Sequence, residues 1–174
     1  AWAASSNVTV AHEIGHTFQY LVSADLGSTH GLNYVLGENS SGNEWWEDCA
    51  NWQAHKVYPS AQFSENWGNN QNMHHMNIIH EGARYNNCYY QDWWCQLHGL
   101  NTIGRVWREA TYPEDPIQAY MRIFGHDEQS FADEQFTGYA HIAAMDIDRW
   151  QTYGQHLIGS EQQRLQEVPE AIVA

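Results

Sequence analysis

The first apolar pattern along the chain advances in steps of three and four residues. Steps of this size place side chains on one face of an α-helix, which repeats every 3.6 residues. They predict an amphipathic helix over residues 8–24, with Gly27 as its stop signal. We expect the apolar stripe to be the side of this helix that packs into the core. The stripe consists of Val8, Ala11, Ile14, Phe18, Leu21 and Val22.

A second helix is predicted over residues 44–57, and it is bounded by polar loops. Pro59 ends it, because a proline disfavours helical backbone in the residue that precedes it. The loops, residues 27–43 and 64–72, are rich in Gly, Asn and Ser. We therefore expect two helices that are joined by a long polar connection and followed by a second polar loop.

The second half of the chain is predicted to form helices in series. Asp115 precedes a proline at a first helical position, Gly125 follows the last turn of the same helix, and Ser130 is the expected cap of the next one. Strand-like alternation is weak everywhere, so we predict a mainly α fold with little or no β sheet, in one domain over residues 1–174. The expected buried faces are Tyr90, Trp93, Trp94 and Leu97; Ile103, Val106, Trp107 and Ala110; Ile117, Tyr120, Met121 and Phe124; and Ala132, Phe136, Tyr139, Ala140 and Ala143.

Composition identifies a globular protein and argues against several classes of function. Hydrophobic residues make up 43% of the 174 residues and charged residues 16%, which is sufficient for a core. The 7 basic and 21 acidic residues give a net charge of −14, which argues against binding to nucleic acid or to an anionic membrane. No apolar run approaches the roughly 20 residues that span a bilayer.

Other features favour an extracellular, secreted protein. Lys56 is the only lysine, and the chain is acidic and rich in tryptophan. The chain runs almost at once into a motif, so we expect it to be a piece of a longer protein. Three cysteines are too few for a disulfide framework. Cys88 and Cys95 could pair, or all three cysteines could be buried thiols.

The strongest chemical signal lies inside the first predicted helix, where His12, Glu13 and His16 fit the pattern H-E-x-x-H. Residues four apart lie on the same face of a helix, so both imidazoles can reach one zinc ion at about 2.0–2.1 Å. Glu13 lies beside that face, where it can take a proton from a zinc-bound water as general base. The motif therefore predicts a catalytic Zn²⁺ site.

A catalytic zinc ion needs a third protein ligand and one open position. No histidine follows His16 closely, since the next one is His30. A glutamate on the second predicted helix is the other source. We favour Glu47, because it opens the pattern E-x-x-A-x-W. Glu44, one helical turn earlier, is the competing ligand.

The pairing of HEIGHTFQ with WWEDCANW resembles the gluzincin superfamily of zinc metallopeptidases. More narrowly, it is similar to a family of secreted microbial proteins that carry the same two motifs, and this resemblance covers most of the chain. It implies a zincin-like helical catalytic domain in which His12, His16 and Glu47 hold Zn²⁺. It also implies cleavage of peptide bonds, with a tyrosine or histidine from a later segment as oxyanion donor.

Candidates for this oxyanion donor lie in and just after the polar residues 73–85. Tyr85 is our first choice, His80 the second and Tyr89 the third. A further candidate follows the third ligand, because Asn51 lies one helical turn after Glu47 on the same face. We expect Asn51 to accept a hydrogen bond from a ligating histidine, as a polar residue at this position does in related enzymes.

These parts predict a zinc-dependent hydrolase that acts on a peptide, protein or glycoprotein substrate. Two alternatives remain open. One is a zinc hydrolase of another bond, such as an amide in a cell-wall or glycan polymer, because fold and metal do not fix the substrate. The other is a non-catalytic glycan- or protein-binding module on a zincin scaffold. It would recognise glycans through exposed Trp and Tyr. The tryptophans near polar loops, which could line a substrate groove or stack on a sugar, are Trp45, Trp46 and Trp67.

Overall fold

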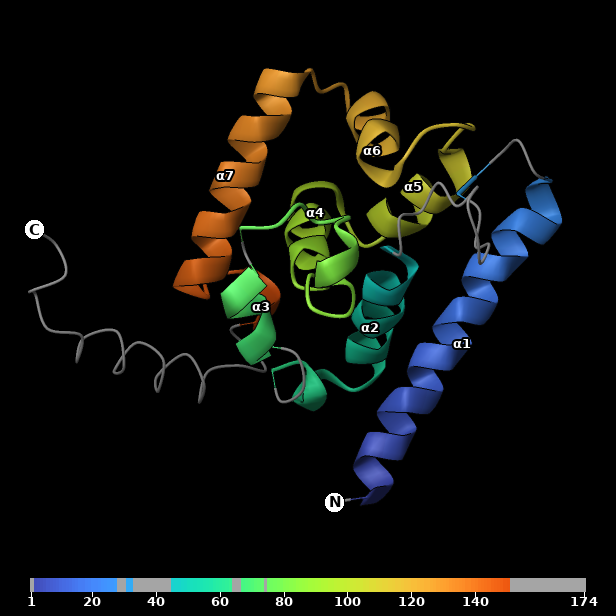
Figure 1. The fold of residues 1–174 in the computed structure, drawn as a ribbon, viewed down its shortest axis with the longest axis vertical. Coiled ribbons are helices and arrows are strands. Elements are labelled where there is room, and N and C mark those ends of the chain that lie inside the picture. Colours follow the sequence, from blue (N-terminus) through green and yellow to red (C-terminus); the bar gives the residue numbers. More distant parts are fainter. Residues whose placement is uncertain (1, 28–30, 33–44, 64–66, 74, 151–174) are drawn as a thin grey trace, which may run out of the picture.

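A computed structural model describes residues 2–27, 31–32, 45–63, 67–73 and 75–150 (Figure 1). These residues form helices and turns, and no strand occurs among them. The mainly α fold is therefore confirmed for this part of the chain. The α-helices are α1 (Trp2–Leu26), α2 (Trp45–Val57), α3 (Trp67–Met73), α4 (Tyr90–His98), α5 (Thr102–Glu109), α6 (Pro116–Phe124) and α7 (Glu128–Ala144), and 3-10 turns lie at Pro59–Ala61 and Glu81–Ala83.

The aromatic core surrounds α4, which Figure 1 shows near the centre of the molecule, between α7 and the pair α1 and α2. Tyr120 of α6 stacks on Trp94 of α4 with ring centroids 3.9 Å apart. Trp45 of α2 stacks on Trp107 of α5 with centroids 5.9 Å apart. The burial predicted for Trp93, Trp94 and Trp107 is confirmed. Large rings from four helices thus supply much of the buried apolar surface.

α1 lies against α2 through a close contact between their backbones (Figure 1). A Cβ atom added to Gly15 would lie 3.1 Å from the Cα atom of Ala50. Two small residues therefore let the helix axes come together at this level, as a larger side chain would not. Because the helices are close at this point, longer side chains before and after it on α1 and α2 can reach one another.

The apolar stripe that we expected to face the core is largely exposed on α1, so this prediction was wrong. Ile14 and Phe18 keep 52% and 59% of their surface accessible, and both line an open hollow of about 390 Å³ beside α2. Val8 and Val22 are buried as expected. The reason is the contact at Gly15, which turns a different side of the helix toward α2.

α7 also presents a face other than the predicted one. Phe136 is 78% exposed, although we expected it in the core. Gly138 is buried instead, and a Cβ atom added to it would lie 2.5 Å from Cδ1 of Trp93. α7 therefore meets α4 at a glycine, where an indole ring of α4 fills the space that a side chain would take.

The ends of α6 and α7 follow the chemistry of helix caps. Asp115 accepts a hydrogen bond from the backbone of Gln118, and Gly125 ends α6 with a left-handed φ of 77°, both as predicted. In α7 the N-cap is Asp127 and not Ser130. Ser130 lies three residues further on and completes the capping box with Asp127.

The tryptophans proposed as contacts for a sugar are buried, and that expectation was wrong. Trp45 and Trp46 belong to α2, and Trp67 begins α3 inside the segment that we predicted as a polar loop. Their indole faces are therefore occupied by the core rather than by solvent. The cysteines follow the second of the two alternatives, since all three are buried free thiols: Cys49, Cys88 and Cys95.

One buried carboxylate connects distant parts of the chain. Asp92 of α4 is buried and is the acceptor for donors from α2, from the turn after it, and from residues 149–150. Burial alone would raise the pKa of Asp92, but the two cations beside it hold its pKa below the usual value. The donors are Trp52, Lys56, Gln62, Arg149 and Trp150.

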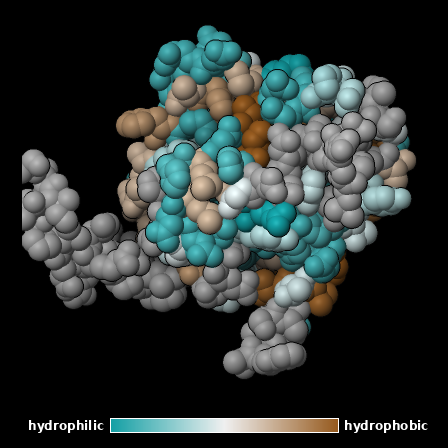
Figure 2. Space-filling view, in the orientation of Figure 1, coloured by the Kyte–Doolittle hydropathy of each residue, from teal (hydrophilic) through white to brown (hydrophobic). Residues whose placement is uncertain are grey.

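The outer surface is mainly polar on the side drawn in Figure 2, where apolar areas are smaller than the hydrophilic ones. This agrees with a net charge of −14 over the whole sequence. Among the helices of the described residues, none combines the length and the apolar character that a membrane span requires.

Candidate metal centre

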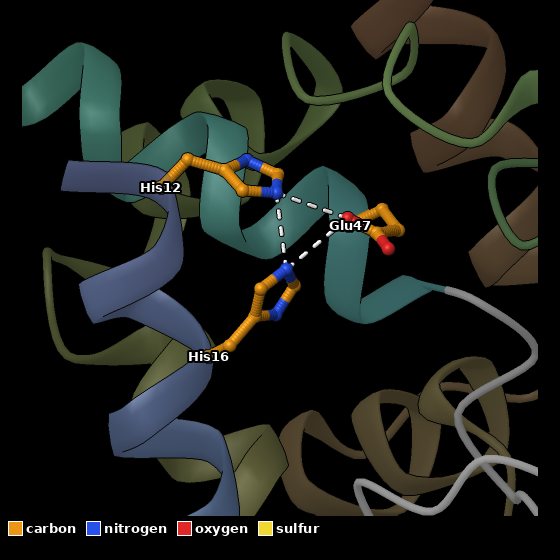
Figure 3. A group of neighbouring side chains, drawn as sticks. All are labelled: His12, His16 and Glu47. Carbon is orange, nitrogen blue, oxygen red and sulfur yellow. Dashed lines mark hydrogen bonds and ion pairs between the residues drawn. The ribbon is translucent and has the colours of Figure 1, made fainter. Parts of the chain in front are cut away.

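Three potential ligand atoms converge between α1 and α2 (Figure 3). His12 Nε2 lies 3.0 Å from both His16 Nε2 and Glu47 Oε2, and His16 Nε2 lies 3.2 Å from Glu47 Oε2. Two ligands bonded at about 2.0–2.1 Å to one tetrahedral ion are roughly 3.3 Å apart. The structure thus brings together the three residues selected from the sequence, in a triangle close to the size that zinc requires.

The outer nitrogen of each histidine faces an amide oxygen. His12 Nδ1 donates to Asn51 Oδ1 over 2.7 Å, and His16 Nδ1 donates to Gln19 Oε1 over 2.9 Å. Each amide is oriented from its other end, because each NH₂ group donates to a backbone carbonyl oxygen. An amide oxygen can only accept, so both Nδ1 atoms carry a proton. The contact expected of Asn51 is therefore present, and Gln19 makes the corresponding contact to the second histidine.

This arrangement leaves both Nε2 atoms directed at a carboxylate oxygen. In neutral rings with a proton on Nδ1, each Nε2 carries a lone pair. Three electron-rich atoms about 3 Å apart repel one another unless a cation lies among them. An oxygen that accepts from the far ring nitrogen is typical of histidines that bind a metal. The donor set therefore fits Zn²⁺, with one oxygen and two nitrogen ligands.

The pKa shifts at the site have the same physical origin. Burial lowers the pKa of His16, but the hydrogen bonds that its protonated ring donates to Glu47 and Gln19 outweigh this and raise the pKa above its usual value of 6.5. Burial would raise the pKa of Glu47, but hydrogen bonds from the protonated rings of His12 and His16 hold it well below the usual value. Both shifts mean that the centre favours a positive charge, which a proton or a metal ion can supply.

The centre is mostly buried but not closed. The side chains of His12, His16 and Glu47 are 12%, 11% and 16% exposed. Structural zinc sites usually have four protein ligands, whereas catalytic sites have three and leave one position for water or substrate. Among the described residues, these three form the group of potential metal ligands between α1 and α2. Three potential ligands in the described part of the chain, with partial exposure, are compatible with an open position for water or substrate.

Tyr85 lies directly beside the ligands. Its ring packs against that of His12 with centroids 6.0 Å apart, and its side chain hydrogen-bonds to Glu47. Its backbone has a φ of 72°, a left-handed conformation that costs a residue other than glycine about 1–3 kcal/mol. Asn51 donates to the Tyr85 carbonyl oxygen over 2.9 Å and supports this conformation. With 39% of its surface exposed, Tyr85 can also contact a bound molecule.

The other candidates of the sequence lie in different settings. Tyr89 is fully buried and donates its hydroxyl proton to a backbone carbonyl, so it cannot serve as an oxyanion donor. His80 accepts a hydrogen bond from the backbone of Gly82 within its own turn. Glu13 is exposed on α1, and its negative charge acts on His16. Glu44, the competing ligand, lies outside the described residues.

Sequence reasoning missed Gln19 and the role of Gly15. Gln19 follows His16 by three residues on the same helix, a spacing that could have suggested a contact between the two side chains. The contact of Gly15 with Ala50 lies across two helices, and no periodicity reports it. The ligands could be selected because their chemistry forms a local pattern, whereas the packing that aligns them could not.

Comparison with known proteins gives a family and no activity. A family model described as "Family of unknown function (DUF6055)" matches residues 1–172. No curated protein matches the chain, and no solved structure matches it. What the protein does must therefore be argued from the chemistry of its site.

Proposed function

The chain belongs to DUF6055, a family of unknown function, and we propose that it is a zinc-dependent hydrolase that cleaves peptide bonds. The observation that carries this proposal is the triangle of His12, His16 and Glu47, in which both outer ring nitrogens are fixed by amide oxygens. The gluzincin resemblance of the motifs supports it, since there too a glutamate on a second helix is the third ligand.

The chain's own residues divide the chemistry among them. When bound, zinc acts as a Lewis acid toward a carbonyl group and lowers the pKa of water. Glu13, which follows the first ligand on α1, accepts the proton of the attacking water and passes it to the leaving amine. His12, His16 and Glu47 hold their positions, because the amides of Asn51 and Gln19 prevent the imidazole rings from rotating.

Tyr85 is the proposed oxyanion donor. Attack on a peptide carbonyl builds negative charge on its oxygen, and a donor aimed at that oxygen stabilises the transition state. A phenol remains protonated at neutral pH and can donate one hydrogen bond. The Tyr85 side chain already interacts with Glu47 and remains partly exposed. For His80, the second choice, the structure gives a hydrogen bond from the backbone of Gly82, and this contact does not favour the role of oxyanion donor.

The alternative of a glycan- or protein-binding module has lost one part of its support. It depended on exposed Trp and Tyr rings, and the three candidate tryptophans are buried. Glu13 would have no role in such a module, whereas a hydrolase requires a base at this position. The composition also supports a secreted location, so the substrate we propose is an extracellular peptide, protein or glycoprotein.

The test is cleavage of a peptide library by the zinc-loaded chain, with products identified by mass spectrometry. Glu13→Gln keeps the size of the side chain but removes the base, so we expect zinc content to stay the same and turnover to fall by roughly a hundredfold or more. Glu109→Gln, an exposed change on α5, is the matched control and is expected to retain full activity.

Three results would count against this function. Equal turnover by Glu13→Gln and the parent chain would exclude Glu13 as the base. The chain could bind zinc at His12, His16 and Glu47 and cleave an amide in a cell-wall or glycan polymer but no peptide. In that case only the proposed substrate would be wrong. Failure to bind zinc at these residues would remove the proposal as a whole.

A further inference from the structure

A second group of potential metal ligands lies where α4, α6 and α7 meet. His98 is the last residue of α4, His126 lies between α6 and α7, and Glu134 belongs to α7. One ligand atom from each lies within 4.8 Å of the others. The group shares no residue with the centre between α1 and α2, and the sequence motifs did not point to it.

Glu134 is the shared partner in this group. Its Oε2 atom lies 3.0 Å from His126 Nε2 and 3.9 Å from His98 Nε2. Its other oxygen accepts a 2.7 Å hydrogen bond from the Tyr120 hydroxyl. One carboxylate oxygen is therefore held by a buried phenol, while the other faces two imidazole nitrogens. Carboxylates that bind metals are commonly oriented by a hydrogen bond of this kind.

The contact between His126 and Glu134 is close but is not a formed hydrogen bond. His126 Nε2 is buried, and it has no hydrogen-bond partner among the described residues, although Glu134 Oε2 lies only 3.0 Å away. A ring N–H does not point along this line. Buried polar atoms in native proteins are nearly always satisfied, so such a pair calls for an explanation. A cation bonded to both atoms would satisfy both.

Aromatic stacking fixes the planes of both imidazole rings. His98 stacks on Phe124 with centroids 3.9 Å apart and 17° between the planes. His126 stacks on Tyr120 with centroids 5.6 Å apart and 8° between the planes. Stacking through the faces leaves the nitrogen atoms at the ring edges available. The rings are thus oriented in advance, which lowers the entropy lost when a ligand binds.

We propose that His98, His126 and Glu134 form a second site for a divalent transition-metal ion, and we expect that ion to be zinc. Two imidazole nitrogens and a carboxylate oxygen are ligands that zinc prefers. The side chain of His98 is 25% exposed, so an ion can enter from that side and retain water. A small movement of His98 toward Glu134 would shorten the 3.9 Å between their ligand atoms.

The hydrogen bonds of Tyr120 define what changes when the ion binds. Its hydroxyl proton goes to Glu134, so its oxygen accepts from His98 Nε2, which lies 2.9 Å away. A metal ion replaces the proton at this nitrogen, and the ring then carries its proton on Nδ1. Burial lowers the pKa of His98. Glu134 acts against this, and His126 and Arg105 add to the lowering. The Arg105 guanidinium is itself paired with Glu109 through two contacts.

The ion would join the end of α4 to α7 and to the segment before it. α7 already contacts α4 at Gly138, and Glu134 lies one helical turn earlier. An ion that binds only the folded chain stabilises it by mass action. The ion would therefore stabilise the fold, and the site does not depend on the hydrolase proposed above.

The experiment measures zinc per chain by atomic emission, on untagged protein that has been saturated with zinc and dialysed. We expect two ions in the parent chain, one in Glu134→Gln, one in His12→Ala and none in the double variant. Glu134→Gln suits this test, because an amide oxygen can still accept from Tyr120 and keep the fold. Its zinc affinity at this site should fall by more than the roughly 10- to 100-fold that loss of an outer-shell partner causes.

A second readout uses His12→Ala, in which only the proposed site remains. Zinc should raise its unfolding temperature and slow hydrogen exchange in α7, and neither effect should occur once Glu134→Gln is added. His75→Ala, an exposed histidine outside both groups, is the control and should keep the metal content of the parent. The proposal is overturned if Glu134→Gln holds as much zinc as the parent, or if zinc leaves the exchange of α7 unchanged.

Discussion

At the scale of single residues, the protonation of the candidate centre is determined by two amides. Asn51 and Gln19 each use the NH₂ group on a backbone carbonyl, so only the oxygen is left for a histidine. The tautomer of His12 and of His16 thus follows from contacts that involve no metal. Because the same amide of Asn51 supports the backbone of Tyr85, the ligand and the proposed oxyanion donor are held by one side chain.

Tyr85→Phe tests this donor. The change removes the hydroxyl that bonds to Glu47 and retains the ring that packs against His12, so we expect zinc affinity to fall by no more than the roughly 10- to 100-fold that loss of such a partner causes. Turnover should fall by roughly ten- to a thousandfold, which is the usual effect of losing one oxyanion donor. The measurement is kcat on a cleaved peptide, together with zinc titration of both chains. Unchanged kcat would transfer the role to another residue, with His80→Ala as the next variant to assay.

The local part of the candidate site could be predicted from the sequence, and the part made by packing could not. His12, His16 and Glu47 lie on two helices whose patterns identify them separately. Tyr85 could be selected only as one of several aromatic and histidine candidates, because a loop has no periodicity that gives its direction. Its left-handed backbone and its contact with Glu47 arise from tertiary structure.

At the scale of helices, α1 and α7 share one departure from the expected packing. In both, the most apolar stripe is partly exposed, and the contact with a neighbouring helix, α2 or α4, is made at a glycine. Gly15 faces Ala50, and Gly138 faces Trp93. Periodicity in the sequence is judged from large apolar side chains and gives no weight to glycine. It therefore predicted burial of Phe18 and of the face around Phe136 instead of the faces that carry the two glycines. Close approach of helices therefore determined which side is buried.

Two glycine substitutions with opposite expected signs test this packing. In Gly138→Ala the new methyl group would overlap the ring of Trp93, and overpacking of this kind costs about 1–3 kcal/mol. Gly104 of α5 has open space at the same position, so Gly104→Ala should stabilise the protein by up to about 1 kcal/mol through helix propensity alone. Thermal unfolding of both variants measures the difference. A loss of stability in Gly104→Ala equal to that in Gly138→Ala would exclude the proposed contact as the cause.

At the scale of the whole molecule, Asp92 connects segments that are far apart in sequence. Lys56 and Arg149 lie on either side of α4 in the chain, and both pair with this one carboxylate. The indoles of Trp52 and Trp150 donate to it as well. Since all its oxygens are satisfied, the buried charge is compensated, but removal of the carboxylate would leave two cations without their partner.

Asp92→Asn should therefore destabilise the protein by roughly 3–5 kcal/mol. The pH dependence follows from the lowered pKa of Asp92. The carboxylate stabilises the fold above its pKa in the unfolded chain, about 3.9, and this contribution is lost as the pH falls through the lower pKa of the folded chain. As the pH falls, the free energy of unfolding should therefore decrease less steeply in the variant than in the parent chain. The measurement is urea unfolding between about pH 3 and pH 7, a range that includes the usual pKa of an aspartate.

Asp133→Asn is the control for this prediction, because Asp133 is an exposed carboxylate on α7. Changes at exposed positions are usually within about 0.5 kcal/mol. If both variants lost the same free energy of unfolding, net charge rather than the buried contacts of Asp92 would be the cause.

The close approach of α1 and α2 at Gly15 also bears on the order in which the protein is assembled. Two ligands lie on one continuous helix, and the third lies on a helix that is pressed against it by backbone contact. Little conformational entropy is left to lose when an ion arrives. Small zinc domains, in contrast, acquire their fold from the ion itself. Here folding can come first and loading second, and an ion can be exchanged without a cycle of refolding.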